Sequence, residues 1–187
     1  VWFWPMGAIP PEAAAGSTLI HIDMLGVFMS VMFAFLGFFV AIYSIRYMEA
    51  DTGLSLYYAL LLTLVGGMIG VVYAGDFLTL FIFWETMSVS SYALVAFRRH
   101  EQEPLEAGIK YFLLSAVGST LILFSISILY GLTGSINFAQ IREALNVLPF
   151  NPLYSPATQG VVLLTIMGLI IGFGVKAAIA PLATWLP

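Results

Sequence analysis

The sequence contains no cysteine and few charged residues, and each absence excludes a class of protein. Without cysteine there can be no disulfide, no cysteine-ligated iron–sulfur cluster and no thiol chemistry. Only 9% of the 187 residues are charged, whereas soluble domains carry about 25%, and no basic run is present that would bind nucleic acid. The two histidines, His21 and His100, lie far apart. We therefore expect no bound metal or cofactor and no nucleic-acid partner.

Apolar residues dominate the sequence, at 61% of the chain, and they gather in long runs. A helix of about 20 apolar residues spans the ~30 Å hydrocarbon core of a bilayer. Five runs of that length are bounded by charged or turn residues, at about residues 22–45, 54–74, 77–97, 105–130 and 157–180. The sequence thus predicts an all-α membrane protein with about five transmembrane helices and a lipid bilayer as its surroundings.

The segments around these runs complete the predicted organisation. Residues 1–21 contain several prolines and are expected to form an external segment, followed by a single transmembrane domain over residues 22–187. In the glycine- and proline-rich connection before the last run, residues 138–147 predict a short interfacial helix. The chain begins at a valine without a leader pattern and stops inside continuing structure, so we expect it to be truncated at both ends.

The arginines indicate the orientation of the chain in the membrane. When the loops are counted alternately, Arg46, Arg98 and Arg99 lie on one side and Arg142 lies on the other. Loops rich in lysine and arginine stay in the cytoplasm. The amino terminus is therefore expected to be external.

Glu85 is the first candidate for function, because it lies near the middle of the third apolar run. An ionisable group at that depth costs at least about 2.5–3.5 kcal/mol, so it is retained for pairing or for function. Ser88 and Tyr92 follow three and seven positions later and predict a polar stripe on one helix face, as in a proton path. The alternative is a protonated carboxyl group that forms a hydrogen bond and only helps the helices to pack.

Lys176 is the second candidate, because it lies late in the fifth run and five residues before Pro181. Proline is expected to break or kink the helix there. Gly168 and Gly172 precede the lysine at four-residue steps and open the helix face from which it projects. A buried Glu85–Lys176 pair whose separation can change could load and release a proton. The alternatives are a static salt bridge or a lysine that extends to the cytoplasmic surface.

Three further patterns are weaker. Lys110 lies about 8 Å into its helix, with Glu106 four residues before it, so an ordinary ion pair at a helix end explains it equally well. Asp76 is interpreted as the cap of the third helix. The spacings Gly66–Gly70 and Gly168–Gly172 predict close contacts between helices.

Three blocks of sequence match a family of known proteins. They are Asp76-Phe77 with Phe83-Trp84-Glu85, then Leu105 to Leu113 (LEAGIKYFL), then Lys176 to Pro181 (KAAIAP) with Trp185-Leu186-Pro187. In this order and spacing the chain resembles the antiporter-like membrane subunits of respiratory complex I, membrane-bound hydrogenases and Mrp-type cation/proton antiporters. The resemblance implies two inverted repeats of five helices, each with a broken helix. This chain would hold the helix before the first repeat and most of that repeat.

The resemblance also implies roles for single residues. Glu85 matches the family's glutamate, Lys176 the lysine at the first broken helix, and Lys110 a lysine near the start of the intervening helix. Ala183 stands where the family often has a histidine.

The function implied by the resemblance is proton translocation in a redox-driven complex of a prokaryotic cell membrane, with no covalent chemistry on this chain. The implied partners are other membrane subunits, peripheral redox subunits acting indirectly, and protons, with sodium as a second candidate ion. The residues also leave alternatives open: an Mrp-type sodium/proton antiporter, a scaffold subunit that does not pump, or a chromoprotein that holds retinal on a lysine.

Overall fold

The computed structural model describes residues 19–49, 51–98, 102–147 and 156–177. Over these ranges the chain forms helices and no named strand. The helices are α1 (Met24–Tyr47), α2 (Leu54–Tyr73), α3 (Phe77–Val95), α4 (Gln102–Thr133), α5 (Phe138–Val147) and α6 (Pro156–Lys176). Five of them, all except α5, are long and apolar enough to cross a membrane. The predicted all-α fold with about five transmembrane helices is confirmed.

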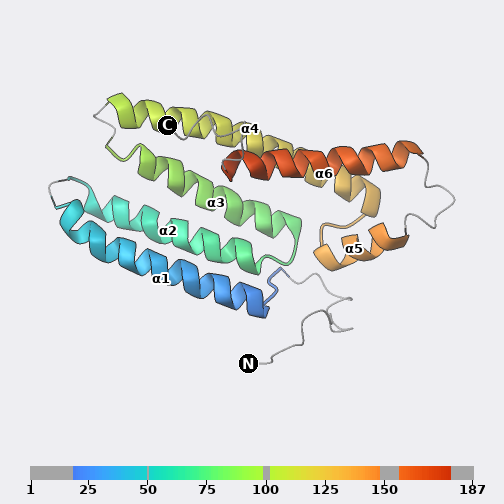
Figure 1. The fold of residues 1–187 in the computed structure, drawn as a ribbon, viewed down its shortest axis with the longest axis horizontal. Helices are drawn as coiled ribbons and strands as arrows, with labels where there is room; N and C mark the ends of the chain where they lie inside the picture. The colour runs from blue at the N-terminus through green and yellow to red at the C-terminus, as the bar shows by residue number, and fades with distance from the viewer. Residues whose placement is uncertain (1–18, 50, 99–101, 148–155, 178–187) are drawn as a thin grey trace.

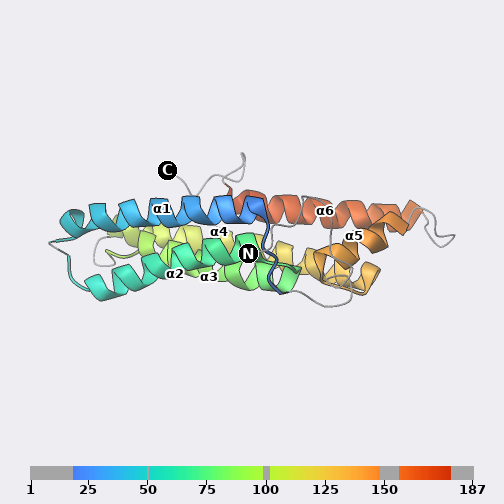
Figure 2. The ribbon, with the colours of Figure 1, turned by 90° about the horizontal axis from the view of Figure 1, so that it is seen from below.

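The long helices lie side by side in chain order (Figure 1). Each of α1 to α4 packs against the next helix along the chain, and α6 packs along α4. Seen from the edge, the bundle is elongated along the helix axes, with the short α5 at one end (Figure 2). The middle of the bundle is therefore the place where α3, α4 and α6 can share a site.

Side-chain and glycine caps define where the helices begin and end. Asp23 precedes α1 and accepts a hydrogen bond from the Gly26 amide at 2.6 Å. Asp76 precedes α3 and accepts from the Thr79 amide at 2.7 Å, so its predicted role as a cap is confirmed. After α4, Gly134 adopts a φ of +73° and its amide donates to Tyr130 O at 2.7 Å, which is the usual way to end a helix with glycine.

The fourth helix is longer than the sequence predicted. It was expected over about 105–130, but it spans Gln102–Thr133, which is 32 residues and about 48 Å. Pro104 fits in its first turn because the first amides of a helix need no acceptor within the helix. The helix is therefore longer than a hydrocarbon core of about 30 Å is thick.

The last helix described, α6, ends at Lys176, and Ala177 lies in a turn. The predicted break at Pro181, the predicted helical residues 178–180, and Ala183 lie outside the described residues. The candidate lysine thus occupies the carboxyl end of α6, where the negative end of the helix dipole favours a cation.

Small residues allow α4 and α6 to approach closely. A Cβ atom on Gly172 would lie 2.5 Å from Ile122 Cγ1 and 2.8 Å from Gly118 O, and one on Gly168 would overlap Ser125 Oγ. The predicted contact through Gly168 and Gly172 is confirmed.

The corresponding prediction for Gly66 is wrong, because nothing lies within 4 Å of a Cβ atom built there. Gly67 and Gly70 make the close contacts of α2 instead, against the Met87 backbone and the Phe83 ring of α3. These two glycines are three positions apart and so share the helix face that meets α3.

The interior of the bundle is rich in hydroxyl groups, whereas large apolar side chains point outward. The buried polar side chains include Ser44, Ser88, Ser90, Ser115, Ser119, Ser125 and Thr165. In α1 only 6% of the most apolar 18-residue stretch is buried. Apolar surface outside and small polar residues at the helix contacts are typical of a protein whose surroundings are lipid or other membrane helices.

Candidate functional site

Glu85 lies at the contact between α3 and α4. Its side chain is half-buried, and the Ser119 hydroxyl of α4 donates a hydrogen bond to Glu85 Oε1. Ser119 is only 8% exposed. The carboxyl group therefore faces the protein interior and not lipid, with a specific donor on the neighbouring helix.

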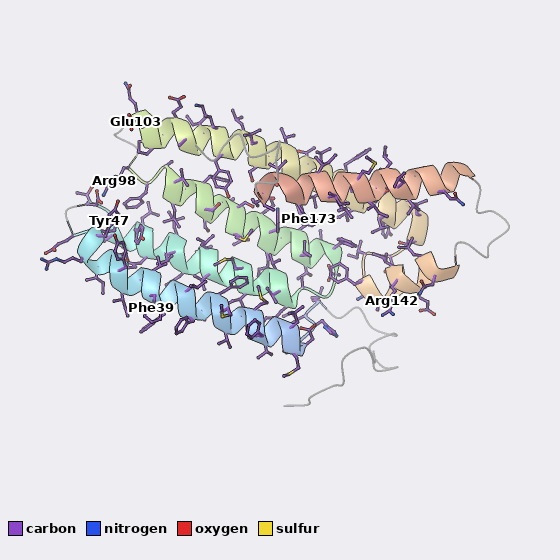
Figure 3. All side chains as sticks on the ribbon, in the orientation of Figure 1. Phe39, Tyr47, Arg98, Glu103, Arg142 and Phe173 are labelled. Carbon is purple, nitrogen blue, oxygen red and sulfur yellow. The ribbon has the colours of Figure 1, made fainter. Side chains whose placement is uncertain are left out.

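Lys176 approaches the same region from α6. Its Nζ atom lies 5.2 Å from the centroid of the Trp84 ring, in the arrangement of a cation–π contact. The Trp84 ring packs edge-on against Phe173 of α6, with 4.8 Å between centroids and 83° between planes. Figure 3 shows Phe173 near the middle of the bundle. The Nζ atom is buried and has no hydrogen-bond partner among the described residues.

The packing of α6 on α4 places Lys176 level with the middle of α4. Gly172 meets Gly118, and Val175 also packs against Gly118, which lies at the middle of the 32-residue α4. Lys176 follows Val175 in the chain, so its backbone lies level with the centre of α4. Glu85 lies at the same level, because it accepts a hydrogen bond from Ser119, the residue after Gly118 in α4.

The two predicted site residues are brought together without forming a salt bridge. Lys176 lies over the ring of Trp84, the residue that precedes Glu85 in α3. The ion pairs formed between described residues lie elsewhere and join Arg46 to Glu49, Arg98 to Asp51 and Lys110 to Glu106. The site therefore contains a carboxyl group and an amino group level with the middle of α4. Each of them contacts a different neutral side chain.

The predicted polar stripe is only partly formed. Ser88 is fully buried, but its hydroxyl donates to Trp84 O of its own helix at 2.5 Å. The Tyr92 ring packs edge-on against Phe112, with centroids 5.2 Å apart. A hydroxyl contact between helices lies beside them, where Ser91 Oγ donates to Tyr111 Oη at 2.8 Å. Polar groups thus continue from Glu85 along the contact between α3 and α4.

Lys110 is not brought to this site. It forms an ion pair with Glu106 at 2.7 Å, and the two side chains are 62% and 68% exposed. An exposed pair of this spacing contributes little to stability, because water screens the two charges. The structure therefore separates Lys110 from the Glu85–Lys176 region.

Comparison with known proteins identifies the family. The family described as "NADH:quinone oxidoreductase/Mrp antiporter, TM" matches residues 74–187, and "NADH-Ubiquinone oxidoreductase (complex I), chain 5 N-terminus" matches residues 16–58. The chain belongs to the NADH:quinone oxidoreductase/Mrp antiporter transmembrane family. The resemblance found in the sequence blocks is confirmed, and with it the assignment as a multi-pass integral membrane protein.

Similar members of this antiporter family are subunits of respiratory enzymes. The chain is 34% identical over 187 residues to NADH-quinone oxidoreductase subunit N of Cupriavidus taiwanensis, covering all of this chain and 37% of that protein. It is 33% identical over 171 residues to F(420)H(2) dehydrogenase subunit N of Methanosarcina mazei, covering 91% of this chain and 33% of that protein. The chain thus spans about a third of the length of these relatives.

Two solved structures of respiratory membrane complexes share the fold. A chain of respiratory complex I from Thermus thermophilus matches with a TM-score of 0.63 at 28% identity, covering 84% of this chain and 32% of that one. A chain of an archaeal membrane-bound sulfane sulfur reductase matches with a TM-score of 0.73 at 28% identity, covering 97% of this chain and 34% of that one. The helix arrangement is therefore that of antiporter-family subunits in large membrane assemblies.

Two residues of the site, Trp84 and Ser119, were not predicted from the sequence. Trp84 was noted only within a matching sequence block, and Ser119 was not singled out. The signal for Ser119 was its four-residue spacing from Ser115, which places both on one face of α4, and both are buried. Trp84 is adjacent to Glu85, but nothing in the sequence indicates that it lies against a lysine 92 positions later.

Proposed function

We propose that this chain is part of a proton-translocating membrane subunit of a redox-driven respiratory complex. The observation that carries the proposal is that the buried Lys176 Nζ lies over the ring of Trp84, next to Glu85 in α3, without forming an ion pair with Glu85. The names of its relatives support it, since they are subunits of NADH-quinone oxidoreductase and F(420)H(2) dehydrogenase. The partners are other membrane subunits, with peripheral redox subunits acting indirectly, in a prokaryotic cell membrane with the amino terminus outside.

In this proposal Lys176 carries the proton and Glu85 controls its charge. A charged ammonium group in an apolar site is favoured when a carboxylate is near and disfavoured when the carboxylate moves away. A change in their separation therefore loads Lys176 with a proton or releases it. The chain itself makes and breaks no covalent bond to substrate, and redox chemistry takes place in partner subunits.

The path to this site runs along the contact between α3 and α4. Ser88, Tyr92 and the Ser91–Tyr111 hydrogen bond provide polar groups between Glu85 and the end of the bundle where α4 begins. Lys110 and Glu106 lie in the first turns of α4 and would collect protons at that end. Water between these groups would complete the connection.

The test of the proposal is the replacement Glu85→Gln in the assembled native complex. Glutamine keeps the size of the side chain and an acceptor for Ser119, but removes the charge that acts on Lys176. Coupling between two sites is typically worth about 1–3 kcal/mol, or about 5- to 150-fold, so we expect proton uptake into vesicles to fall about tenfold. The matched control is Glu103→Gln, an exposed acid in the first turn of α4. Unchanged uptake in the Glu85 variant would leave the chain as a scaffold.

A smaller effect is expected for Lys110→Met. Because Lys110 is exposed at a helix end, where water can also deliver protons, we expect the rate of proton uptake to fall less than in Glu85→Gln. The measurement is the initial rate of vesicle acidification at fixed electron-transfer rate. A loss as large as that of Glu85→Gln would show that Lys110 is an obligatory carrier.

A sodium/proton antiporter of the Mrp type is the second candidate, because the matching family includes Mrp antiporters. Transport measured with and without sodium separates the two functions. Sodium-independent proton uptake coupled to electron transfer supports the first proposal, and sodium-dependent uptake without a redox donor supports the second.

A further inference from the structure

Glu85 and Lys176 are each held by a different neutral side chain. Ser119 of α4 donates to the carboxyl group, and the Trp84 ring of α3 faces the ammonium group. We propose that Trp84 and Ser119 form a latch that keeps Lys176 and Glu85 apart in one state of the site. They are positioning residues, and this inference rests on the proposed proton translocation.

The geometry of α3 explains how Trp84 can separate the charges. Trp84 and Glu85 are consecutive in a helix of about 3.6 residues per turn, so their side chains leave the axis about 100° apart. An ammonium group held over the Trp84 ring is thereby drawn away from the direction of the carboxyl group. Phe173, three residues before Lys176, packs edge-on against the same indole and limits its rotation.

Ser119 acts on the other charge. It lies on α4, across the helix contact from Glu85, and its hydroxyl is directed at Oε1. To form a direct ion pair, the carboxyl group must leave Ser119, the ammonium group must leave Trp84, or both must move. The latch therefore makes the separated state a defined arrangement, and a shift of α4 or α6 against α3 would open it.

The burial of Lys176 favours this role over simple packing. A lysine that only fills space between helices normally extends its ammonium group to water or to an acceptor. The Nζ atom here is buried without a hydrogen-bond acceptor among the described residues, and it lies over the Trp84 ring. An aromatic face is the neutral group that attracts a cation without accepting its proton.

The experiment varies the strength of each contact in the complete native complex. At position 84 we would introduce increasingly fluorinated tryptophans, which withdraw charge from the ring face and hardly alter its shape. We would also make Trp84→Phe, Trp84→Leu, Ser119→Ala and Ser119→Thr. The readouts are protons pumped per electron and the infrared carboxylate band that disappears in Glu85→Gln. Phe124→Leu is the control, since Phe124 is an exposed aromatic of α4.

If the latch exists, coupling falls step by step with fluorination and about tenfold in Trp84→Leu, while Trp84→Phe recovers part of it. In Ser119→Ala the infrared band shifts to that of a paired carboxylate, and Ser119→Thr restores it. Wild-type coupling in the fluorinated series and an unshifted band in Ser119→Ala would overturn the latch. That result together with lost uptake in Glu85→Gln leaves the proposed function intact, whereas wild-type uptake in Glu85→Gln removes both.

Discussion

Replacing Lys176 with alanine is expected to reduce proton uptake to the background of empty vesicles. In the proposed function the Nζ atom of Lys176 carries the proton at the α3–α4–α6 site, and alanine has no group that can take up a proton. Alanine fits the helix and leaves the contact of α6 with α4 through Gly172 unchanged. The measurement is uptake driven by the native electron donor, after equal assembly of the variant has been verified.

Lys176→Arg distinguishes loss of charge from loss of a transferable proton. Arginine keeps a cation over the Trp84 ring but does not deprotonate under physiological conditions. We therefore expect Lys176→Arg to assemble as well as wild type and to pump as poorly as Lys176→Ala. Undiminished uptake in either variant would place the proton pathway outside this site.

Replacing Gly172 with valine is expected to prevent α6 from docking on α4. The first added carbon would lie 2.5 Å from Ile122 Cγ1 and 2.8 Å from Gly118 O, and the carbonyl oxygen belongs to the backbone of a long helix. Overpacking of this kind costs about 1–3 kcal/mol or more. Because α6 carries Lys176, both assembly and proton uptake should be lost. The amount of intact complex after detergent extraction measures the first effect.

Gly160→Ala, which also adds a Cβ atom to a glycine of α6, is the control for that variant. Gly160 lies in the same helix, and nothing approaches within 4 Å of a Cβ atom placed there. Alanine in a helix is favoured over glycine by up to about 1 kcal/mol, so this variant should assemble and pump normally. Equal yields of the Gly172 and Gly160 variants would contradict the close-packing interpretation.

The fold could be predicted from the sequence because its strongest determinants are local. An apolar run long enough for the bilayer must be helical, since its backbone groups have no other partners there. Asp76 could be recognised as a cap because its side chain bonds within three residues. The length of α4 was underestimated because the apolar run lies between Pro104 and Gly131, whereas the helix includes both residues.

The site could be predicted only in part. Glu85 and Lys176 were found because an ionisable group at membrane depth requires an explanation on any helix face. Their partners, Ser119 and Trp84, depend on how far α4 and α6 are shifted along α3, and that register follows from contacts such as Gly172 with Gly118. The direction of the Ser88 hydroxyl was also not predictable, because a serine in a helix can bond either to its own backbone or across to a neighbour.

The height of Lys176 in the bundle has an electrical consequence for the proposed function. A proton that reaches Lys176 from one side has crossed only part of the membrane, whereas full transfer of one charge is worth about 2.3 kcal/mol per 100 mV. In the proposed function, loading and release at Lys176 divide the transmembrane voltage between them. Each half-step works against roughly half of the potential, so the height of the lysine in the bundle sets how the opposing voltage is shared between uptake and discharge.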